Sequence, residues 1–309
     1  MDYYIGMDIG GTNIRIRAEF SDGSRPEEFL AAGCTMNTSG YERARACYQK
    51  AAGDFLKRHQ LRPEDCRGLC AAVSGVDTEE EAEACRSMFG EMGFAGERIW
   101  IFNDCEILLT LTDQPALVAV AGTGSVVYGR GADGRTVRSG GWGHIISDEG
   151  SAMYMGLRVL QAAGRHMDGS CSCPELFALF QSRCPAGTLN ALDHYVNDHI
   201  LDKPAIAGLA GILEPAAQKG DPQAARILEE SVGALSELIE NSYRKVCMNG
   251  PAPEILFLWG SVLMKNRAVS EGVRARMQAV HPGLRMEVPQ QTAAETALRC
   301  ARRRGQKNG

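Results

Sequence analysis

Two aspartates in the N-terminal part of the sequence lie at the ends of short apolar runs. Asp8 follows Tyr3–Met7, and Asp104 comes one residue after Ile99–Phe102. Apolar runs of this length predict buried strands, and open α/β sheets bind their ligands at the carboxyl ends of strands. A carboxylate in that place can hold Mg²⁺, directly or through water, or accept a proton from a reacting hydroxyl group. We therefore expect Asp8 to orient a metal ion and Asp104 to act as a general base.

A glycine-rich turn follows the first of these runs. Its residues are Gly10, Gly11, Thr12 and Asn13. The alternation of apolar and polar residues from Ile14 to Phe20 predicts a second strand, so the turn joins a hairpin. Glycine lets backbone N–H groups approach a phosphate closely, and the two polar side chains add donors. A plain tight hairpin with a solvated Asp8 is the alternative, just as Asn103–Asp104 can simply cap a helix that starts near Glu106.

A second turn of the same kind lies much further along the chain. The apolar run Leu117–Ala121 leads into Gly122, Thr123, Gly124 and Ser125, and Val126–Tyr128 resumes as a strand. One such unit is a weak signal, whereas two predict a duplicated scaffold whose turns face each other across a nucleotide. The pair resembles the phosphate-binding loops of the superfamily that contains actin, Hsp70 and the sugar kinases. This resemblance implies a two-domain, actin-like ATPase (ribonuclease H-like) α/β fold with the nucleotide in the interdomain cleft.

The most specific stretch runs from Ser139 to Ala152 and surrounds Trp142 with glycines. Such a composition fits neither a helix nor a regular strand. An aromatic side chain on a glycine-rich loop offers a flat apolar face to a sugar, and Asp148 and Glu149 offer acceptors for sugar hydroxyl groups. In the alternative interpretation, Trp142 fills the interface between the domains and Asp148 caps a helix that begins at Ser151.

This stretch resembles the N-acetylglucosamine kinases of the BadF/BadG/BcrA/BcrD ATPase family. The similarity runs nearly the whole chain and includes Met36–Thr38, Asn103–Asp104 and Gly260–Leu263. Carried over by motif, the resemblance implies that Asp104 is the catalytic base. The sugar-contacting positions are expected to be Asn37, Asp104, Ser125, Val126, Gly141, Trp142 and Asp148. The ATP-contacting positions are expected to be Gly10, Gly11, Thr12, Asn13, Gly122, Thr123, Gly124, Ala217, Gly260 and Ser261.

The resemblance implies ATP-dependent phosphorylation of an N-acetyl amino sugar, with ATP and Mg²⁺ as cofactors. N-acetylglucosamine, converted to its 6-phosphate, is the first expectation. N-acetylmuramate and glucosamine stay open as substrates, because a few hydrogen bonds decide among such sugars. Ser147 stands where the family usually has glycine, which puts the exact sugar in doubt. The resemblance also implies a homodimer.

Two rival functions come from other classes of protein. An ATPase that activates a 2-hydroxyacyl-CoA dehydratase-type reductase would need an iron–sulfur cluster, for which only Cys105, Cys171 and Cys173 are candidate ligands. A non-catalytic sugar sensor is disfavoured, because both phosphate turns and both aspartates, Asp8 and Asp104, are retained.

Composition and charge narrow the classes of partner. The 309 residues suffice for two domains, and 44% hydrophobic with 23% charged residues is ordinary for a globular protein. A net charge of −5 argues against a nucleic-acid or anionic-membrane surface. The 11 cysteines show no paired metal-ligand spacing. No run of about 18 apolar residues and no signal peptide are recognisable, so we expect a cytoplasmic protein without a membrane span.

The elements that position these residues fall into two expected domains, 1–114 and 115–309, with the last helix able to pack back on the first domain. In the first domain, helices and strands alternate after the hairpin, which is an α/β pattern. The second is more helical, and no motif is recognisable in 165–205. The expected helices are 41–58, 77–92, 151–166, 174–183, 205–219, 221–247, 265–280 and 291–304. The expected later strands are 68–73, 99–102, 254–259 and 284–288. A polar loop is expected at 33–40, and Asp221 is expected to cap the helix 221–247, with Pro222 at its first helical position.

Overall fold

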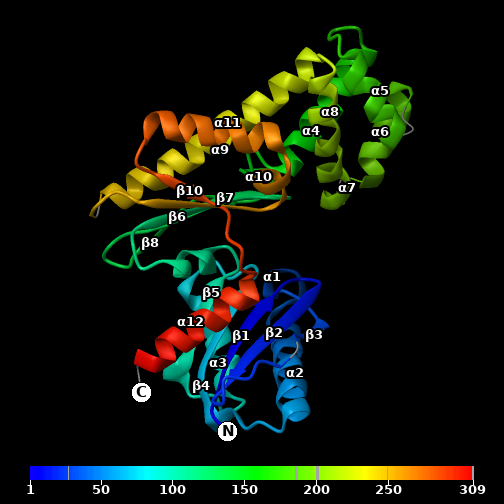
Figure 1. Cartoon of the computed structure of the whole chain (residues 1–309). Coiled ribbons are helices and arrows are strands. Elements are labelled where there is room, and N and C mark those ends of the chain that lie inside the picture. Colours follow the sequence, from blue (N-terminus) through cyan, green and yellow to red (C-terminus); the bar gives the residue numbers. More distant parts are fainter. Residues whose placement is uncertain (27, 185–186, 200–201, 249, 308–309) are drawn as a thin grey trace. The chain divides into compact units, whose positions relative to one another are not determined.

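The chain begins with the expected hairpin, formed by β1 (Tyr3–Ile9) and β2 (Asn13–Phe20), in a computed structural model of the protein (Figure 1). The structure describes all residues except 27, 185–186, 200–201, 249 and 308–309. In β2, Ile14, Ile16 and Ala18 are buried in alternation with more exposed polar residues, as the period of a half-buried strand requires.

The chain divides into two compact units, one made of residues 1–113 with 289–309 and the other of residues 114–288. The first unit holds a sheet of five strands in the order β3-β2-β1-β4-β5. Its further strands are β3 (Phe29–Ala32), β4 (Cys66–Val73) and β5 (Ile99–Asn103). The first three strands of the chain pair antiparallel, and β4 and β5 continue in parallel from β1.

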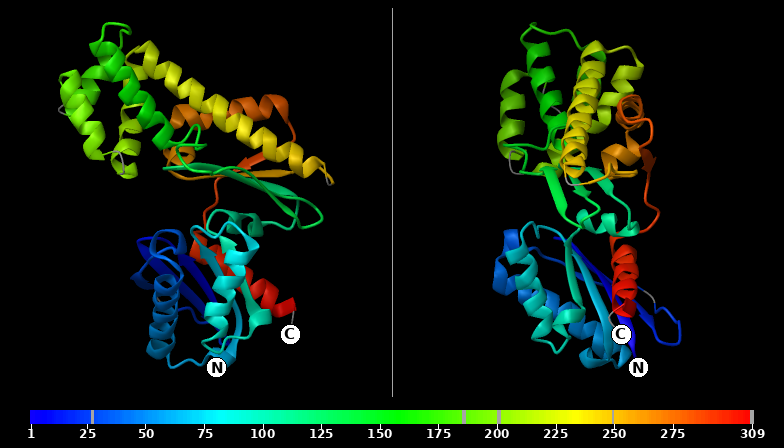
Figure 2. Two further views of the ribbon diagram at one scale, coloured as in Figure 1. Left: turned by 180° about the vertical axis from the view of Figure 1, so that it is seen from behind. Right: turned by 90° about the vertical axis from the view of Figure 1, so that its left-hand side faces the viewer.

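Helices cover both faces of this first sheet (Figure 2). Helices α2 (Tyr41–His59) and α3 (Glu79–Gly90) bury apolar side chains in the core on one face, together with Ile5 and Met7 of β1. On the other face, α12 (Ala293–Lys307) lies directly on β1 and β4. The close approach of α12 depends on Gly6, because a Cβ atom there would come within 2.1 Å of the Leu298 backbone nitrogen.

The second unit repeats the same strand topology. Its sheet has the order β10-β9-β6-β7-β8, with an antiparallel meander of β6, β7 and β8 and with β9 and β10 parallel to β6. The strands are β6 (Ala116–Ala121), β7 (Ser125–Arg130), β8 (Thr136–Gly140), β9 (Ile255–Trp259) and β10 (Arg285–Glu287). The duplicated scaffold that the two glycine-rich turns predict is therefore present.

The long helix α9 (Pro222–Cys247) lies across β7 and β8 in the second unit, and several of the unit's other helices pack against it (Figure 1). As expected, Asp221 caps α9: its Oδ1 accepts the backbone N–H groups of Gln223 and Ala224 at 3.0 Å. The other helices are α4 (Ala152–Met167), α5 (Pro174–Arg183), α6 (Leu189–His199), α7 (Lys203–Gly208), α8 (Leu213–Gln218), α10 (Ser261–Lys265) and α11 (Arg267–Val280). Among the described residues, every helix is too short or too polar to cross a bilayer.

Some expected boundaries were wrong. The single helix expected at 205–219 is instead α7, a 3₁₀ helix η4 (Leu209–Ile212) and α8. The helix expected at 265–280 is preceded by the separate α10, because Asn266 leaves the helical conformation and caps α11. The polar loop expected around residue 37 contains the short helix α1 (Met36–Ser39).

The packing at Gly6 leads to a stability prediction. We expect Gly6→Ala to destabilise the protein by about 1–3 kcal/mol, because the added methyl group has only backbone to displace. The matched control is Gly53→Ala in α2, where the new Cβ would meet only Met92 Cε at 3.9 Å. That control should stabilise by about 0.5–1 kcal/mol, the usual gain for alanine over glycine inside a helix. Urea unfolding followed by circular dichroism measures both, and equal effects of the two substitutions would contradict this packing.

Candidate functional site

Asp8 lies half-buried at the carboxyl end of β1, opposite Arg15 of β2. The Arg15 Nη1 atom is 3.4 Å from Asp8 Oδ2. Burial raises the pKa of the Asp8 carboxyl, the Arg15 charge opposes that effect, and repulsion from Asp104 raises the pKa further. Asp8 and Asp104 therefore interact within the first unit, although nearly a hundred residues separate them in the chain. The role of Arg15 was not anticipated from the sequence.

Asp104 follows the last residue of β5, and its neighbour Asn103 shapes the turn. The buried Asn103 side chain accepts the Cys105 N–H at 2.9 Å and donates to the Val76 carbonyl at 3.1 Å. The following 3₁₀ helix, η3 (Glu106–Leu111), has Cys105 as its N-cap residue and no side-chain cap. The Asn103 side chain therefore holds this turn through these two hydrogen bonds.

The Asp104 carboxyl lies in a poorly solvated place. Burial raises its pKa above the ordinary value for aspartate, and hydrogen bonds from Ser74 and Cys105 partly offset the effect. A carboxylate with a raised pKa is a stronger proton acceptor than an ordinary one, which suits a general base.

The turn after β4 connects Asp104 with Asn37. Ser74 hydrogen-bonds the Asp104 carboxyl, and the next residue, Gly75, accepts the Asn37 Nδ2 at the carbonyl with a distance of 3.1 Å. Gly75 has φ of 80°, and a Cβ atom there would lie 2.8 Å from Asn37 Nδ2. The first unit therefore brings three of the predicted residues together, namely Asp8, Asn37 and Asp104. Ser74 was missed as a site residue, although its place at the carboxyl end of a strand was a usable signal.

The first glycine-rich turn is supported from below by Gly33. Gly10 N donates to Asn13 O at 2.9 Å, and Gly33 N donates to Thr12 O at 2.9 Å. A Cβ atom on Gly33 would lie 2.1 Å from the Gly10 carbonyl oxygen, so only glycine permits this approach. Gly11 and Thr12 are left exposed at the tip of the turn, available to a ligand.

The second glycine-rich turn rests on the N-terminus of α4. Gly122 N donates to Gly124 O at 2.9 Å, which closes the turn. Ala152 N donates to Gly122 O at 2.8 Å, and Met153 N donates to Thr123 O at 3.2 Å. The first N–H groups of a helix have no partner inside the helix, and here the turn supplies their acceptors.

Asp148 joins this turn to the tryptophan loop, which comprises residues 140–150 around Trp142. The nearly buried Asp148 accepts the Ser125 N–H at Oδ1 with a distance of 3.1 Å, and Ser125 Oγ donates to Glu149 O at 2.8 Å. A Cβ atom on Gly124 would lie 2.8 Å from the same Oδ1 atom. The helix α4 is capped by Ser151, whose Oγ accepts the Tyr154 N–H at 3.1 Å, so the alternative that Asp148 is the cap was wrong.

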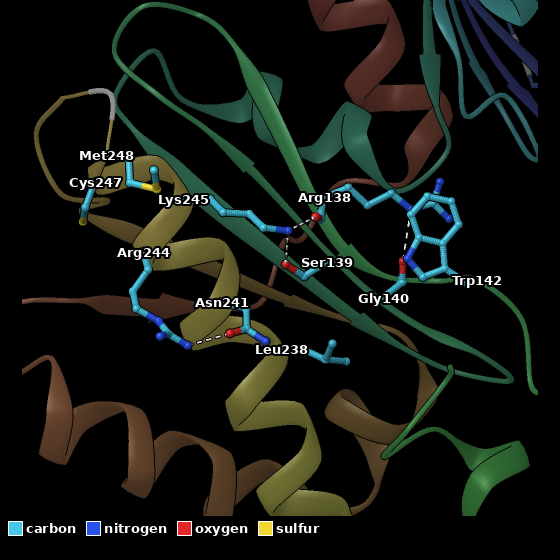
Figure 3. Close-up of a pocket in the computed structure, with 10 residues that line it drawn as sticks. All are labelled: Arg138, Ser139, Gly140, Trp142, Leu238, Asn241, Arg244, Lys245, Cys247 and Met248. Atoms are coloured by element: carbon cyan, nitrogen blue, oxygen red, sulfur yellow. Dashed lines mark hydrogen bonds between the residues drawn. The ribbon is translucent and has the colours of Figure 1, made fainter. Parts of the chain in front are cut away.

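Trp142 lies on the surface of its own unit, with 62% of the side chain exposed. Its ring lies over the guanidinium group of Arg138, with 4.4 Å from Arg138 Cζ to the ring centroid. The predicted neighbours Gly141 and Val126 are in contact, since a Cβ atom on Gly141 would lie 2.9 Å from Val126 Cγ2. Trp142 also borders a groove of about 830 Å³ between β8 and α9 (Figure 3).

The predicted adenosine residues lie beside the second turn, in the same unit. Gly260, with φ of 90°, approaches the end of β6 so closely that a Cβ atom would be 2.4 Å from Ala121 O. Ser261 lines a cavity of about 420 Å³. Pro215 and Gln218 line it as well, whereas Ala217 between them does not. The lining residues that were not anticipated from the sequence include Met155, Glu214, Lys265 and Asn266.

The candidate cluster ligands Cys171 and Cys173 lie in the described part of the chain. The residues described there contain no group of three or more histidine, cysteine, aspartate or glutamate side chains that could hold a metal ion. Cys173 is buried with Sγ 3.7 Å from Ala162 O, and Cys171 Sγ lies 3.9 Å from Gln223 Oε1. The carboxylates of Asp8 and Asp104 are hard oxygen donors of the kind that Mg²⁺ prefers.

Comparison with known proteins places this arrangement in a family. Residues 5–295 match the model of the BadF/BadG/BcrA/BcrD ATPase family. The chain belongs to this family. The N-acetylmuramic acid/N-acetylglucosamine kinase of Clostridium acetobutylicum is 30% identical over 257 residues, covering 80% of this chain and 84% of the relative. The N-acetyl-D-glucosamine kinase of Dictyostelium discoideum is 22% identical over 292 residues, covering 91% and 92%.

A solved structure of similar shape supports the fold. It is the Chromobacterium violaceum protein provisionally named N-acetylglucosamine kinase, with a TM-score of 0.73 and 22% identity, covering 97% of this chain and 99% of that one. The predicted actin-like ATPase fold is thereby confirmed, and membership of an ATPase family indicates that the protein uses ATP.

The raised pKa of Asp104 leads to a second prediction. Burial disfavours the ionised Asp104 carboxyl, so its pKa is higher in the folded than in the unfolded protein. The contribution of this group to the free energy of unfolding is therefore fully present below the unfolded pKa and is lost as the pH rises through the folded pKa. The uncharged variant Asp104→Asn should therefore unfold about 2–4 °C higher than wild type at pH 7. The difference should shrink as the pH falls through the raised folded pKa of Asp104 and vanish below the unfolded value of about 4, where both proteins are neutral at this position.

The control for this prediction is Asp198→Asn, at an exposed position in α6. Its unfolding temperature should match that of wild type across the same pH range. A lower unfolding temperature for Asp104→Asn at pH 7 would show that the hydrogen bonds to the carboxylate outweigh its burial.

Proposed function

We propose that this protein is a kinase that transfers the γ-phosphoryl group of ATP to a hydroxyl group of an N-acetyl amino sugar. N-acetylglucosamine, phosphorylated at its primary hydroxyl to give the 6-phosphate, is the first candidate. The observation that carries the proposal is the half-buried pair Asp8 and Asp104 beside a glycine-rich turn, in a chain whose relatives are named as kinases of amino sugars.

The proposed base is Asp104. Its carboxylate accepts the proton of the sugar hydroxyl as the oxygen attacks the γ-phosphorus in line. Ser74 orients the carboxylate, and Asn37, fixed on the Gly75 carbonyl, offers a polar contact to the sugar. Asp8 is the residue that would hold Mg²⁺, directly or through water, and the bound ion supplies neutralisation of phosphate charge.

The phosphates of ATP are proposed to bind the two glycine-rich turns, 10–13 and 122–125. The proposed donors are the backbone N–H groups of the exposed residues Gly11, Thr12 and Thr123, as at other anion-binding turns. The cavity beside Ser261 is proposed to take the adenosine, since its 420 Å³ falls within the size range of small-molecule sites. Trp142 and the Asp148 loop are proposed to contact the sugar, with one Asp148 oxygen already engaged in holding Ser125.

The preference among amino sugars is proposed to depend on the segment around Ser147. The Ser147 hydroxyl, which replaces the glycine usual in the family, donates to Glu149 Oε2 at 3.2 Å. A reoriented Glu149 changes the acceptors that a sugar meets, and one unpaired polar group is enough to discriminate substrates. N-acetylmuramate and glucosamine are therefore the alternative substrates. Location in the cytoplasm and assembly as a homodimer stay predictions.

The test is release of ADP from Mg·ATP, measured by a coupled assay with and without N-acetylglucosamine, N-acetylmuramate, N-acetylmannosamine, glucosamine and glucose. We expect one N-acetyl sugar to stimulate release strongly. Asp104→Asn should lower the turnover rate by about 10²–10⁴-fold while ATP and sugar still bind.

Asp198→Asn serves again as the control and should keep the wild-type rate. Turnover of Asp104→Asn within tenfold of wild type would remove Asp104 from the role of base. ADP release without any dependence on sugar would contradict the kinase and support the ATPase that activates a reductase.

A further inference from the structure

Arg138, in β8, contacts the tryptophan loop at three places although it was not singled out from the sequence. Its Nε donates to Gly140 O at 3.1 Å, and its Nη2 donates to Gly141 O at 2.6 Å. Its Cζ atom lies 4.4 Å from the centroid of the Trp142 ring (Figure 3). One planar guanidinium group thus holds two successive carbonyl groups and the face of the aromatic ring.

The backbone of Arg138 is itself fixed to α9. Lys245 Nζ donates to Arg138 O at 2.6 Å and to Ser139 Oγ at 3.1 Å. The buried Ser242 Oγ lies 2.9 Å from the buried Ser139 Oγ. These bonds anchor β8 on a long helix, so the guanidinium group projects toward the loop from a rigid base.

The hydrogen bonds that fix the rest of the tryptophan loop do not hold the Trp142 ring: Gly143 O accepts the N–H groups of Ile146 and Ser147, and Asp148 Oδ1 accepts the N–H of Ser125. Gly140, Gly141 and Gly143 all have positive φ angles, between 74° and 87°. Glycine adopts this conformation about as readily as one with negative φ, so these residues do little by themselves to fix the loop. Trp142 is 62% exposed and so gains little orientation from a core. The position of its ring therefore depends on the stacking and hydrogen bonds of Arg138.

We propose that Arg138 is a positioning residue of the sugar site, which holds Trp142 as a platform for the apolar face of the sugar. The proposal rests on the sugar kinase activity proposed above, since it assigns the platform to that substrate. The role requires the planar fork of arginine, because a lysine cannot donate to two carbonyl groups in one plane and stack on an indole at the same time.

The test compares Arg138→Met and Arg138→Lys with Arg244→Met. Arg244 borders the same groove but bonds to Asn241 Oδ1 at 2.6 Å and touches neither glycine. We expect Arg138→Met to raise the KM for the sugar about 10- to 100-fold, with the KM for ATP within about twofold of wild type. Arg138→Lys should recover less than half of the loss on a logarithmic scale, and Arg244→Met should be within about twofold for both substrates.

A rise in the two KM values by equal factors, a sugar KM within twofold of wild type, or full recovery in Arg138→Lys would each overturn the proposal. Wild type without sugar-dependent turnover would instead overturn the proposed kinase. The positioning of Trp142 is then decided by near-ultraviolet circular dichroism. The signal of the Trp142 ring is the one that Trp142→Phe removes from the wild-type spectrum. If Arg138→Met loses this signal, the positioning role is supported, and if the signal is unchanged, the role is overturned. Thermal unfolding midpoints of the variants show that each one is folded.

Discussion

The burial of two carboxylates at the carboxyl ends of β1 and β5 is the constraint on which the first unit depends. Neither charge is fully hydrated, and each raises the free energy of the other. The structure offsets this cost with Arg15 at Asp8 and with Ser74 at Asp104. Buried charges with incomplete compensation are characteristic of sites where a ligand or metal completes the electrostatics. Because β1, β4 and β5 run parallel, both carboxylates lie at the same end of these strands.

The second unit has the same strand topology, but its glycine-rich turn is held in a different way. Its turn at 122–125 carries no carboxylate of its own and is shaped by contacts from later in the chain: the α4 N–H groups and Asp148 Oδ1. Because Asp148 holds Ser125, the turn at 122–125 and the tryptophan loop form one hydrogen-bonded structure. If the proposed sugar and nucleotide bind there, this hydrogen bond is the contact through which one ligand would affect the loop that binds the other.

Local signals in the sequence were enough for the elements and turns but not for the supporting contacts. Asp221 and Pro222 predicted the start of α9, and the alternation of apolar and polar residues predicted β2. Both signals depend only on neighbours in the chain. The edge strands β3 and β8 were missed, because β3 is a run of only four apolar residues, none of them fully buried, and β8 has no apolar run. Gly33 and Ser74 were missed as site residues, because they act through contacts with distant segments, although the place of Ser74 at the end of a strand was a usable signal. Arg15 and Arg138 contact residues near them in the chain, but the sequence pattern does not show toward which residues their side chains point.

The most direct measurement is ³¹P NMR of the products formed from Mg·ATP and the amino sugars N-acetylglucosamine, N-acetylmuramate and glucosamine. Transfer to the sugar predicts ADP and a new phosphomonoester signal in equal amounts, coupled to the two protons of the sugar's CH₂ group. ADP together with inorganic phosphate, and with each sugar recovered unchanged, would contradict phosphoryl transfer to an amino sugar.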